Sequence, residues 1–152
     1  MTTTAGPANT VETLRWQDIS EGDDVAPLDI AITTTMIVAG AIASRDFMPV
    51  HHDRDYANQQ GAPDIFMNIL TDTGYCSRFL TDWAGPDAMV TKLAIRLGVP
   101  VFPGHTLTYT GSITALRRDG DDGVVEVDLR ATNELGEHVG GTATINLPGP
   151  TA

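Results

Sequence analysis

The spacing of apolar residues predicts one long helix in the middle of the chain. From residue 65 to residue 83, apolar side chains recur at three- and four-residue steps, which gathers them on one face of a helix. Asp64, directly after Pro63, is the expected N-cap, and Gly85 with Pro86 is expected to end the helix. The stripe consists of Ile65, Ile69, Thr73, Cys76, Leu80 and Trp83. A helix of roughly five turns with one apolar face is therefore predicted.

Beyond Pro86 the period of the apolar residues changes to the two-residue alternation of half-buried strands. Turn residues separate the alternating runs, and one long helix followed by antiparallel strands is typical of an α+β domain. Because the helix has a single apolar face, a curved sheet wrapped around it is the expected arrangement. The four runs are 89–97, 107–116, 125–131 and 143–147.

The first third of the chain predicts a strand, a short helix and a long loop. Residues 25–33 fit a strand, and the uncharged residues 35–43, rich in Ala, Ile and Val, fit a short buried helix. Residues 44–63 are dense in charge, histidine, proline and glycine, which predicts a long loop with one helical turn; such loops are often functional. The expected organisation is a disordered tail at 1–12, one domain at 13–148 and a C-terminal tail at 149–152.

Composition limits the partners and the setting of the protein. The 152 residues suffice for one domain with a hydrophobic core. The net charge of −11 argues against nucleic-acid binding, and an anionic ligand would need a local basic site or charge from a partner chain. The single cysteine, Cys76, allows no internal disulfide and favours a reduced, cytoplasmic setting. No apolar run approaches the roughly 20 residues of a membrane span, and residues 1–10 do not resemble a signal peptide.

An acid and a histidine lie five residues apart in the predicted loop. Pro49 stiffens the path between Asp46 and His51. A carboxylate and an imidazole that converge on one water can orient it, take its proton and return a proton to carbon. Such general acid–base catalysis contributes roughly 10²–10⁴ in rate. Taken alone, the pair is more often a turn aspartate and a solvated histidine, so the residues by themselves leave both interpretations open.

The stretch around this pair resembles the motif of MaoC-like, (R)-specific enoyl-CoA hydratases. The matching residues are Asp46, Pro49, Val50, His51, Asp53 and Ala57. Met48 replaces the family's Asn, and Tyr56 replaces its Phe or Ala. A second stretch, 96–107, is similar to the family's Arg-Phe-…-Pro-Val-…-Pro-Gly-Asp-Thr-Leu, with His105 in place of Asp. The resemblance covers about residues 25–147.

The resemblance implies a single hotdog domain in which a water between Asp46 and His51 adds to an α,β-unsaturated acyl-CoA. In the family, an Ile-Ala-His-Gly sequence begins the central helix, and its backbone N–H groups hold the thioester carbonyl. The matching residues 65–68 read Ile-Phe-Met-Asn, so the backbone of Met67 and Asn68 is the expected oxyanion site although the His-Gly pair is missing. No cofactor is implied, because coenzyme A is part of the substrate.

Four further segments resemble the small catalytic subunits of actinobacterial steroid side-chain hydratases. They are RDF at 45–47, VHHDRD at 50–55, DIFMNILTDTG at 64–74 and TDWAGP at 81–86. This likeness implies a steroid enoyl-CoA substrate in cholesterol degradation. It also implies a heteromeric complex with a larger MaoC-like subunit that lacks the Asp–His pair. Two alternatives stay open: a hotdog acyl-CoA thioesterase, and a non-catalytic MaoC-like partner subunit.

The remaining charged and polar residues have simpler interpretations. Basic candidates for the coenzyme A phosphates are Lys92, Arg96, Arg117 and Arg118, although a solvated strand face explains them equally well. The four histidines and the cysteine show no metal-ligand spacing, so no metal site is expected. His52 is interpreted as a loop side chain, and His105 and His138 as surface or turn residues.

Two groups of acidic and polar residues are expected to have structural partners. Asp53 and Asp55 are expected to cap a turn or to pair with Arg54. The polar residues 71–73 fall within the long helix, where buried groups need hydrogen-bond partners. Packing at a subunit interface is one interpretation of them.

Overall fold

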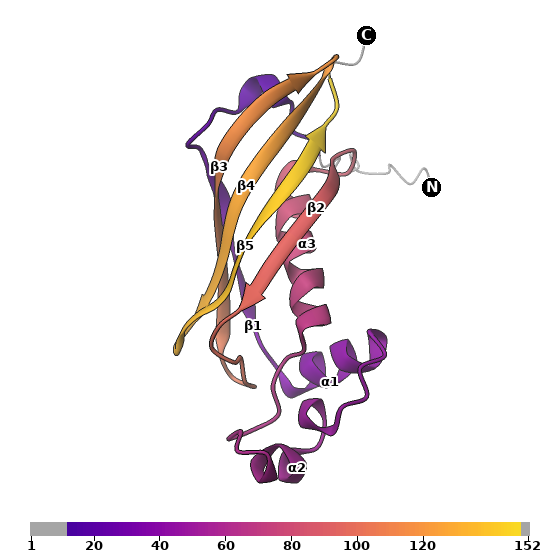
Figure 1. Cartoon of the computed structure of the whole chain (residues 1–152), viewed down its shortest axis with the longest axis vertical. Coiled ribbons are helices and arrows are strands. Elements are labelled where there is room, and N and C mark those ends of the chain that lie inside the picture. Colours follow the sequence, from indigo (N-terminus) through magenta and orange to yellow (C-terminus); the bar gives the residue numbers. More distant parts are fainter. Residues whose placement is uncertain (1–11, 150–152) are drawn as a thin grey trace, which may run out of the picture.

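A long helix lies against the concave face of a curved five-stranded sheet in the computed structural model, which describes residues 12–149 (Figure 1). The strand order is β1-β3-β4-β5-β2, and every neighbouring pair is antiparallel. The α+β prediction is therefore confirmed. The strands are β1 (Asp24–Ala31), β2 (Met89–Leu97), β3 (Thr106–Asp119), β4 (Asp122–Asn133) and β5 (Gly136–Leu147). The helices are α1 (Thr34–Ala43), α2 (Arg54–Gln59) and α3 (Ile69–Ala84), with 3-10 turns η1 (Trp16–Asp18) and η2 (Pro49–His51).

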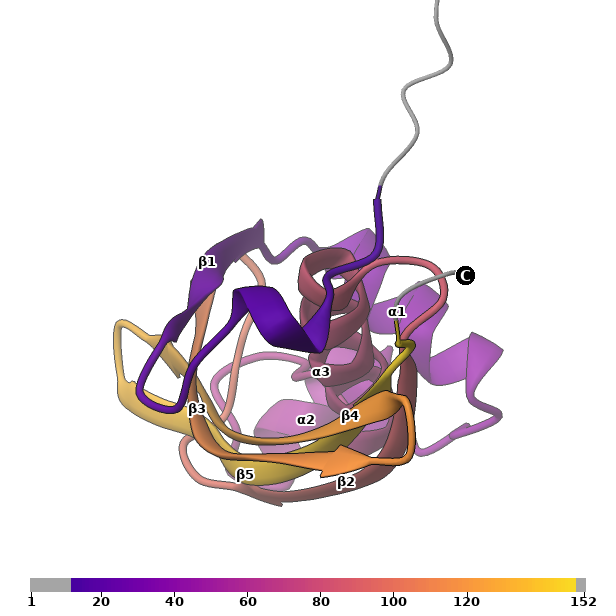
Figure 2. The same ribbon diagram turned by 90° about the horizontal axis from the view of Figure 1, so that it is seen from above.

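The core lies between α3 and the sheet that curves around it (Figure 2). The inward face of α3 contributes fully buried apolar side chains, and Phe79 packs on Tyr109 of β3 with ring centroids 5.8 Å apart. Complete burial of such a side chain contributes about 1.5–3 kcal/mol. The helix residues are Cys76, Phe79, Leu80 and Ala84. They meet the inward residues of the central strands, among them Val125, Val127, Leu129, Ala143 and Ile145.

The long helix begins later than its apolar stripe suggests. Asn68, not Asp64, is the N-cap of α3, because its side chain accepts a hydrogen bond from the N–H of Thr71. Asp64 instead pairs with Arg54 at 2.8 Å and accepts the N–H of its neighbour Ile65. Residues 64–68 are not helical. Ile65 is buried as part of this non-helical segment, so its helical spacing from the buried residues of α3 is a coincidence.

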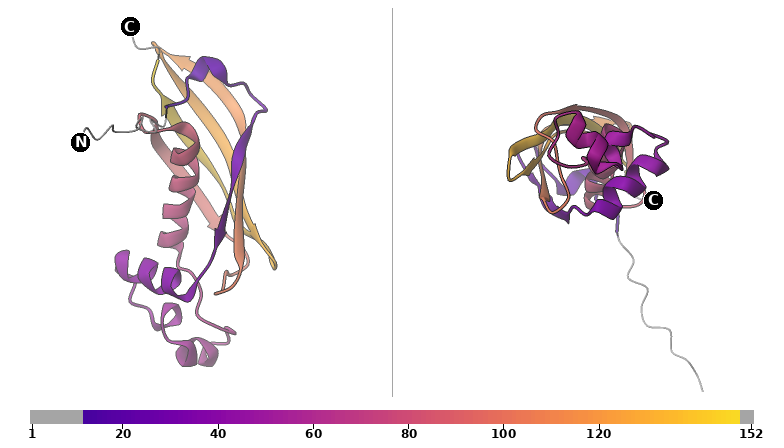
Figure 3. Two further views of the ribbon diagram at one scale, coloured as in Figure 1. Left: turned by 180° about the vertical axis from the view of Figure 1, so that it is seen from behind. Right: turned by 90° about the horizontal axis from the view of Figure 1, so that it is seen from below.

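The predicted loop at 44–63 contains more structure than one helical turn. It includes both η2 and α2, and Asp53 caps α2 by accepting the N–H of Tyr56, as expected. These short helices gather with α1 at the N-terminal end of α3 (Figure 3). The short helix predicted at 35–43 is present as α1, but only Ile37 and Ala41 are buried within it, so its predicted burial holds for one side only.

The expected tails fall almost wholly outside the described residues. Of the predicted tail at 1–12, only Glu12 is described, and of the tail at 149–152 only Gly149 is described. In the described part of the chain, no helix is long and apolar enough to cross a membrane.

Candidate active site

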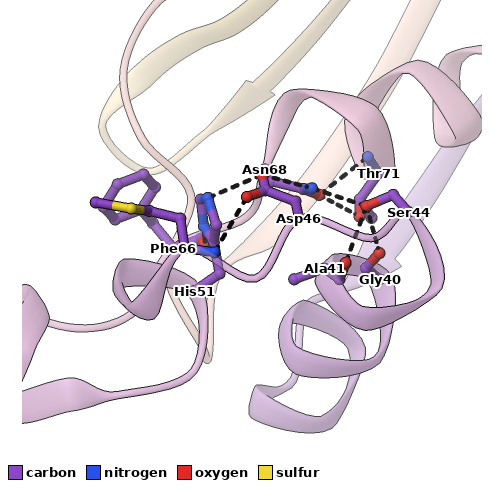
Figure 4. A network of polar contacts seen from close by, with 9 residues as sticks. Gly40, Ala41, Ser44, Asp46, His51, Phe66, Asn68 and Thr71 are labelled. Atoms are coloured by element: carbon purple, nitrogen blue, oxygen red, sulfur yellow. Dashed lines mark hydrogen bonds and ion pairs between the residues drawn. The ribbon is translucent and has the colours of Figure 1, made fainter.

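The two predicted catalytic side chains meet beside the N-terminal end of α3 (Figure 4). Nε2 of His51 lies 3.3 Å from Oδ2 of Asp46. Asp46 follows the C-terminus of α1, where Arg45 adopts a left-handed backbone with φ of 60° and turns the chain. His51 lies in η2 and is only 7% exposed, whereas the Asp46 side chain is 30% exposed. The imidazole is thus packed in place while the carboxylate reaches solvent.

A backbone carbonyl determines which nitrogen of the neutral His51 ring carries the proton. Nδ1 of His51 lies 2.6 Å from the carbonyl oxygen of Phe66, and the Phe66 ring stands edge-on to the imidazole. A carbonyl only accepts hydrogen bonds, so Nδ1 must carry the proton. In the neutral ring, Nε2 is therefore the basic atom, and it faces Asp46. An imidazole in this tautomer can accept a proton at Nε2.

The side chain of Asn68 holds Asp46 from the other side. Its amide Nδ2 donates to Oδ2 of Asp46 at 3.0 Å and to Oγ of Ser44 at 2.9 Å. Its Oδ1 accepts from the N–H of Thr71 at 3.1 Å and from the Thr71 hydroxyl at 2.5 Å. Ser44 in turn donates to the carbonyl of Gly40. Every hydrogen-bonding position of the amide is used, so Asn68 links α1, the Asp46 loop and the first turn of α3.

This environment keeps Asp46 ionised. The hydrogen bond from Asn68 is the largest influence and lowers the pKa of Asp46, while burial raises it in part. The N–H of Met48 and the nearby His51 lower the pKa further. Arg45 is exposed and is not among the groups that lower it. At neutral pH the site therefore presents a carboxylate and not a carboxylic acid.

The two expected backbone donors are not equivalent. The N–H of Met67 donates to the carbonyl of Val101 at 3.2 Å, so it already has a partner and is removed as a candidate. No hydrogen bond among the described residues uses the N–H of Asn68. Asn68 is the N-cap of α3, at a helix end where unpaired N–H groups and the helix dipole favour negative charge. Of the two expected oxyanion donors, the backbone N–H of Asn68 is therefore the one that remains available.

The structure does not bring Lys92 and Arg96 to the Asp46–His51 pair. Both are exposed on β2, an edge strand of the sheet. Leu93, Ile95 and Leu97 alternate with them and pack against the core, so the two basic side chains point to the face of the sheet away from α3.

An apolar groove runs between α1 and α3 beside the polar network. Its volume is about 410 Å³. Ser44 and Thr71 belong to both the groove and the network around Asn68. The lining residues are Gly40, Ala43, Ser44, Leu70, Thr71, Gly74, Tyr75 and Arg78. The sequence did not reveal this groove or the roles of Ser44 and the Asn68 side chain. The only available signal was the Asn68–Thr71 spacing, which is typical of a helix cap.

One of the expectations about the histidines was wrong. His138 is not a surface residue, because it is 2% exposed and pairs with Asp72. Asp72 thus has the hydrogen-bond partner that a buried polar group in the long helix was expected to need. His105 follows a turn and lies 3.6 Å from Glu134. Among the described residues, no group of His, Cys, Asp and Glu could hold a metal ion.

A curved antiparallel sheet around one helix, with an Asp–His pair at the start of that helix, defines a hotdog-fold domain of the hydratase type. The chain belongs to the MaoC-like domain family, whose model matches residues 18–135. Both the family resemblance and the predicted hotdog fold are thereby confirmed.

Relatives in two bacteria make the likeness more specific. The chain is 50% identical over 113 residues to the 3-oxo-4,17-pregnadiene-20-carboxyl-CoA hydratase beta subunit of Mycobacterium tuberculosis, covering 74% of this chain and 83% of that protein. It is 30% identical over 102 residues to the (R)-specific enoyl-CoA hydratase of Rhodospirillum rubrum, covering 66% of this chain and 70% of that protein.

Solved structures agree with these relatives. A chain of the ChsH1-ChsH2 complex from Mycobacterium tuberculosis superposes with a TM-score of 0.79 at 44% identity, covering 84% of this chain and 98% of that chain. The (R)-hydratase of A. caviae involved in PHA biosynthesis superposes with a TM-score of 0.78 at 25% identity, covering 87% and 99%.

Proposed function

We propose that this chain is the Asp–His subunit of an enoyl-CoA hydratase that acts on a steroid side-chain acyl-CoA. Two observations support the proposal. The Asp46–His51 pair is assembled at the start of α3. It lies in a chain that is 50% identical to a subunit named for a pregnadiene-carboxyl-CoA substrate. The pair supplies the acid–base chemistry, and the likeness supplies the substrate class.

The geometry supports a water-addition mechanism with His51 as the proton carrier. A water bound between the two side chains gives a proton to Nε2 of His51 as its oxygen bonds to Cβ of the unsaturated thioester. The electron pair of the double bond moves toward the thioester oxygen, which the N–H of Asn68 stabilises; one such donor is typically worth roughly 10²–10³ in rate. The imidazolium then returns the proton to Cα. Asp46 stays ionised throughout, orienting the water and stabilising the imidazolium. No electrons are gained or lost, so the reaction needs no redox cofactor.

The groove between α1 and α3 supports a bulky acyl group. It begins at Ser44 and Thr71, beside the catalytic pair, and its lining is largely apolar. Gly40 and Gly74 contribute no side chains to it. A Cβ atom added at Gly74 would meet no atom within 4 Å, so a larger side chain at this lining position can narrow the groove without an immediate clash.

Substrate preference tests the proposal. The purified enzyme should hydrate 3-oxo-4,17-pregnadiene-20-carboxyl-CoA with a kcat/KM well above that for crotonyl-CoA. Gly74→Leu should lower kcat/KM for the steroid substrate about tenfold and leave crotonyl-CoA nearly unaffected, because only the large acyl group needs the groove. Gly74→Ala is the matched control and should change neither value greatly. A preference for crotonyl-CoA in the unaltered protein would instead indicate an ordinary fatty-acyl hydratase.

Product analysis separates the hydratase from the thioesterase alternative. A hydratase adds one water per acyl-CoA and leaves the thioester intact. A thioesterase releases free coenzyme A thiol, which a thiol reagent detects. Thiol release at the rate of substrate loss would therefore overturn the proposal.

We also propose that the chain works in a cytoplasmic heteromer with a larger MaoC-like subunit that lacks the Asp–His pair. Four observations support this. A chain of the ChsH1-ChsH2 complex is a close structural match. The net charge of −11 favours a more basic partner that can help to hold the coenzyme A phosphates. Strands β1 and β2 have open edges within the described chain. Ile42, Ile69 and Leu70 are exposed apolar side chains on α1 and α3.

Purification of the chain alone tests this assembly. Its mass in solution and its hydratase activity should be measured with and without the larger subunit. We expect an inactive or weakly active chain that gains activity in an α₂β₂-like complex. A stable homodimer with full activity and no partner would refute the heteromer while leaving the hydratase proposal intact.

A further inference from the structure

A second histidine–carboxylate pair is buried behind the candidate active site. Nε2 of His138, on β5, lies 2.9 Å from Oδ1 of Asp72, on α3. Nδ1 of the same ring lies 2.5 Å from the carbonyl oxygen of Val99. His138 is 2% exposed and Asp72 is 0% exposed, so neither can touch a substrate. The mechanism above makes no use of these residues.

We propose that Asp72 and His138 form a positioning pair for the proposed hydratase reaction, holding in place the short segment that orients both catalytic side chains. This inference rests on the proposed function, because it concerns the geometry of the same Asp46–His51 site.

Residues 66–68 are the segment in question. The carbonyl of Phe66 accepts from Nδ1 of His51, and the side chain of Asn68 donates to Asp46. A small displacement of this segment would therefore move both members of the catalytic pair at once. Misplacement by about 1 Å is enough to reduce a rate up to 10²-fold.

The buried imidazole connects the two supports of this segment. The first support is the loop after β2, where Val101 accepts the N–H of Met67 and Val99 accepts from His138. The second is the first turn of α3, where Asp72 pairs with His138 and donates its own N–H to the carbonyl of Asn68. His138 thus fixes the loop and the helix turn relative to one another.

A buried histidine–carboxylate pair often stabilises a core less than apolar side chains would, which argues for a role beyond packing. Well-packed apolar residues at such a position are often as stable as a buried ion pair or more so. Oδ2 of Asp72 has no hydrogen-bond partner, and neither has the buried hydroxyl of Tyr109. The other ionisable groups near Asp72 are Tyr75, Cys76 and Tyr109, and burial raises the pKa of each, to about 12 for Cys76. They are uncharged at neutral pH, so the contact between Asp72 and His138 dominates this part of the core.

The test compares three variants in the complex with the larger subunit. Asp72→Leu removes the contact, and we expect kcat to fall about tenfold with little change in KM, because the catalytic pair is displaced while the groove is not. Asp72→Asn should retain most of the activity, because its amide can donate to Nε2 of a neutral His138. Cys76→Ala, one helical turn further along α3 and equally buried, is the matched control. It should lower the melting temperature without lowering kcat.

A spectroscopic measurement separates positioning from simple destabilisation. The chain has four histidines, so its ¹⁵N-histidine spectrum can be assigned. The ring nitrogen shifts of His51 should move in Asp72→Leu and stay in place in Cys76→Ala. If Asp72→Leu does not fold, the double variant Asp72→Asn with His138→Leu leaves no buried charge unpaired and should show the same loss.

Unchanged kcat and unchanged His51 shifts in Asp72→Leu, or in the double variant where Asp72→Leu does not fold, would overturn the inference. A wild-type complex that hydrates no enoyl-CoA would instead refute the proposed function. The His51 shifts would still decide whether the buried pair positions the ring.

Discussion

The two histidine–carboxylate pairs of this protein are built in the same way but differ in access. In each, Nδ1 contacts a backbone carbonyl, that of Phe66 for His51 and that of Val99 for His138. In each, Nε2 faces an aspartate. The distance is 3.3 Å in the Asp46–His51 pair, called the exposed pair here because its carboxylate reaches solvent, and 2.9 Å in the buried pair. The Asp46 side chain is 30% exposed, and that of Asp72 is fully buried.

The difference in access predicts different roles for the two pairs, catalysis for Asp46 and His51 and positioning for Asp72 and His138. The exposed pair can share a water with a substrate, and Asn68 provides one of its carboxylate oxygens with a donor that favours ionisation. The buried pair has no route for substrate and leaves a carboxylate oxygen unpaired. Under the proposed function, access to solvent and the neighbouring donor, rather than the contact between the two side chains, distinguish the catalytic pair from the positioning pair.

The largest effect should come from removing the exposed pair. Asp46→Asn or His51→Ala should lower kcat about 10²-fold or more, as loss of an acid–base group does. Steady-state hydration by the intact complex gives the rate, and circular dichroism confirms folding. His52→Ala, an exposed neighbour, is the control and should do far less harm. Near-normal kcat in Asp46→Asn or His51→Ala would contradict the proposal that this pair is catalytic and the buried pair is not.

A smaller effect should follow from replacing the amide N–H donor of the Asn68 side chain by a carboxylate oxygen, which can only accept hydrogen bonds. Asn68→Asp keeps an oxygen to cap Thr71 but loses the hydrogen bond to Asp46 and adds a negative charge beside it. Because that hydrogen bond is the largest cause of the lowered pKa of Asp46, the pKa should rise. The acid limb of kcat/KM should move to higher pH, and kcat should fall about tenfold.

Loss of a helix cap elsewhere provides the comparison for Asn68. Asp53→Ala removes the cap of α2 and should reduce stability by about 1 kcal/mol without moving the acid limb. An unmoved acid limb in Asn68→Asp as well would show that Asn68 does not control the ionisation of Asp46.

The buried pair should affect stability more than activity, with a definite pH dependence. Burial lowers the pKa of His138, but the hydrogen bond and charge of Asp72 and the hydrogen bond to Val99 together raise it more, so the net pKa is raised. The stabilisation is therefore complete below the unfolded value of about 6.5 and is lost as pH rises through the folded pKa. Asp72→Asn should cost roughly 1–3 kcal/mol at pH 6 and flatten this dependence. Urea unfolding of both proteins between pH 6 and pH 9 measures it, and parallel curves would contradict the pairing.

The exposed site was more predictable than the buried pair because its members are near in sequence. Asp46 and His51 lie on one short loop, so their spacing and the family resemblance identified them together. Asp72 and His138 are 66 positions apart and meet only after β5 has closed against the sheet around α3. No local pattern marks such a contact, and His138 was therefore misread as a surface residue.

The fold was predictable where periodicity is strong and less so at its boundaries. The strands and the long helix follow from their apolar spacing. The start of α3 was misplaced because Ile65 fits the helical stripe, although it is buried from a non-helical segment. The side-chain role of Asn68 depends on that start, so it could not be found before the helix boundary was known.

The close approach of α1 and α3 makes two positions genetically interdependent. A Cβ atom at Gly40 would collide with the side chain of Thr71, which cannot turn aside without leaving Asn68. Overpacking of this kind typically costs about 1–3 kcal/mol. Gly40→Ala should therefore be harmful alone and be relieved by a smaller residue at position 71. Mutational libraries of this protein should recover changes at the two positions together, as an epistatic pair, more often than changes at Gly40 alone.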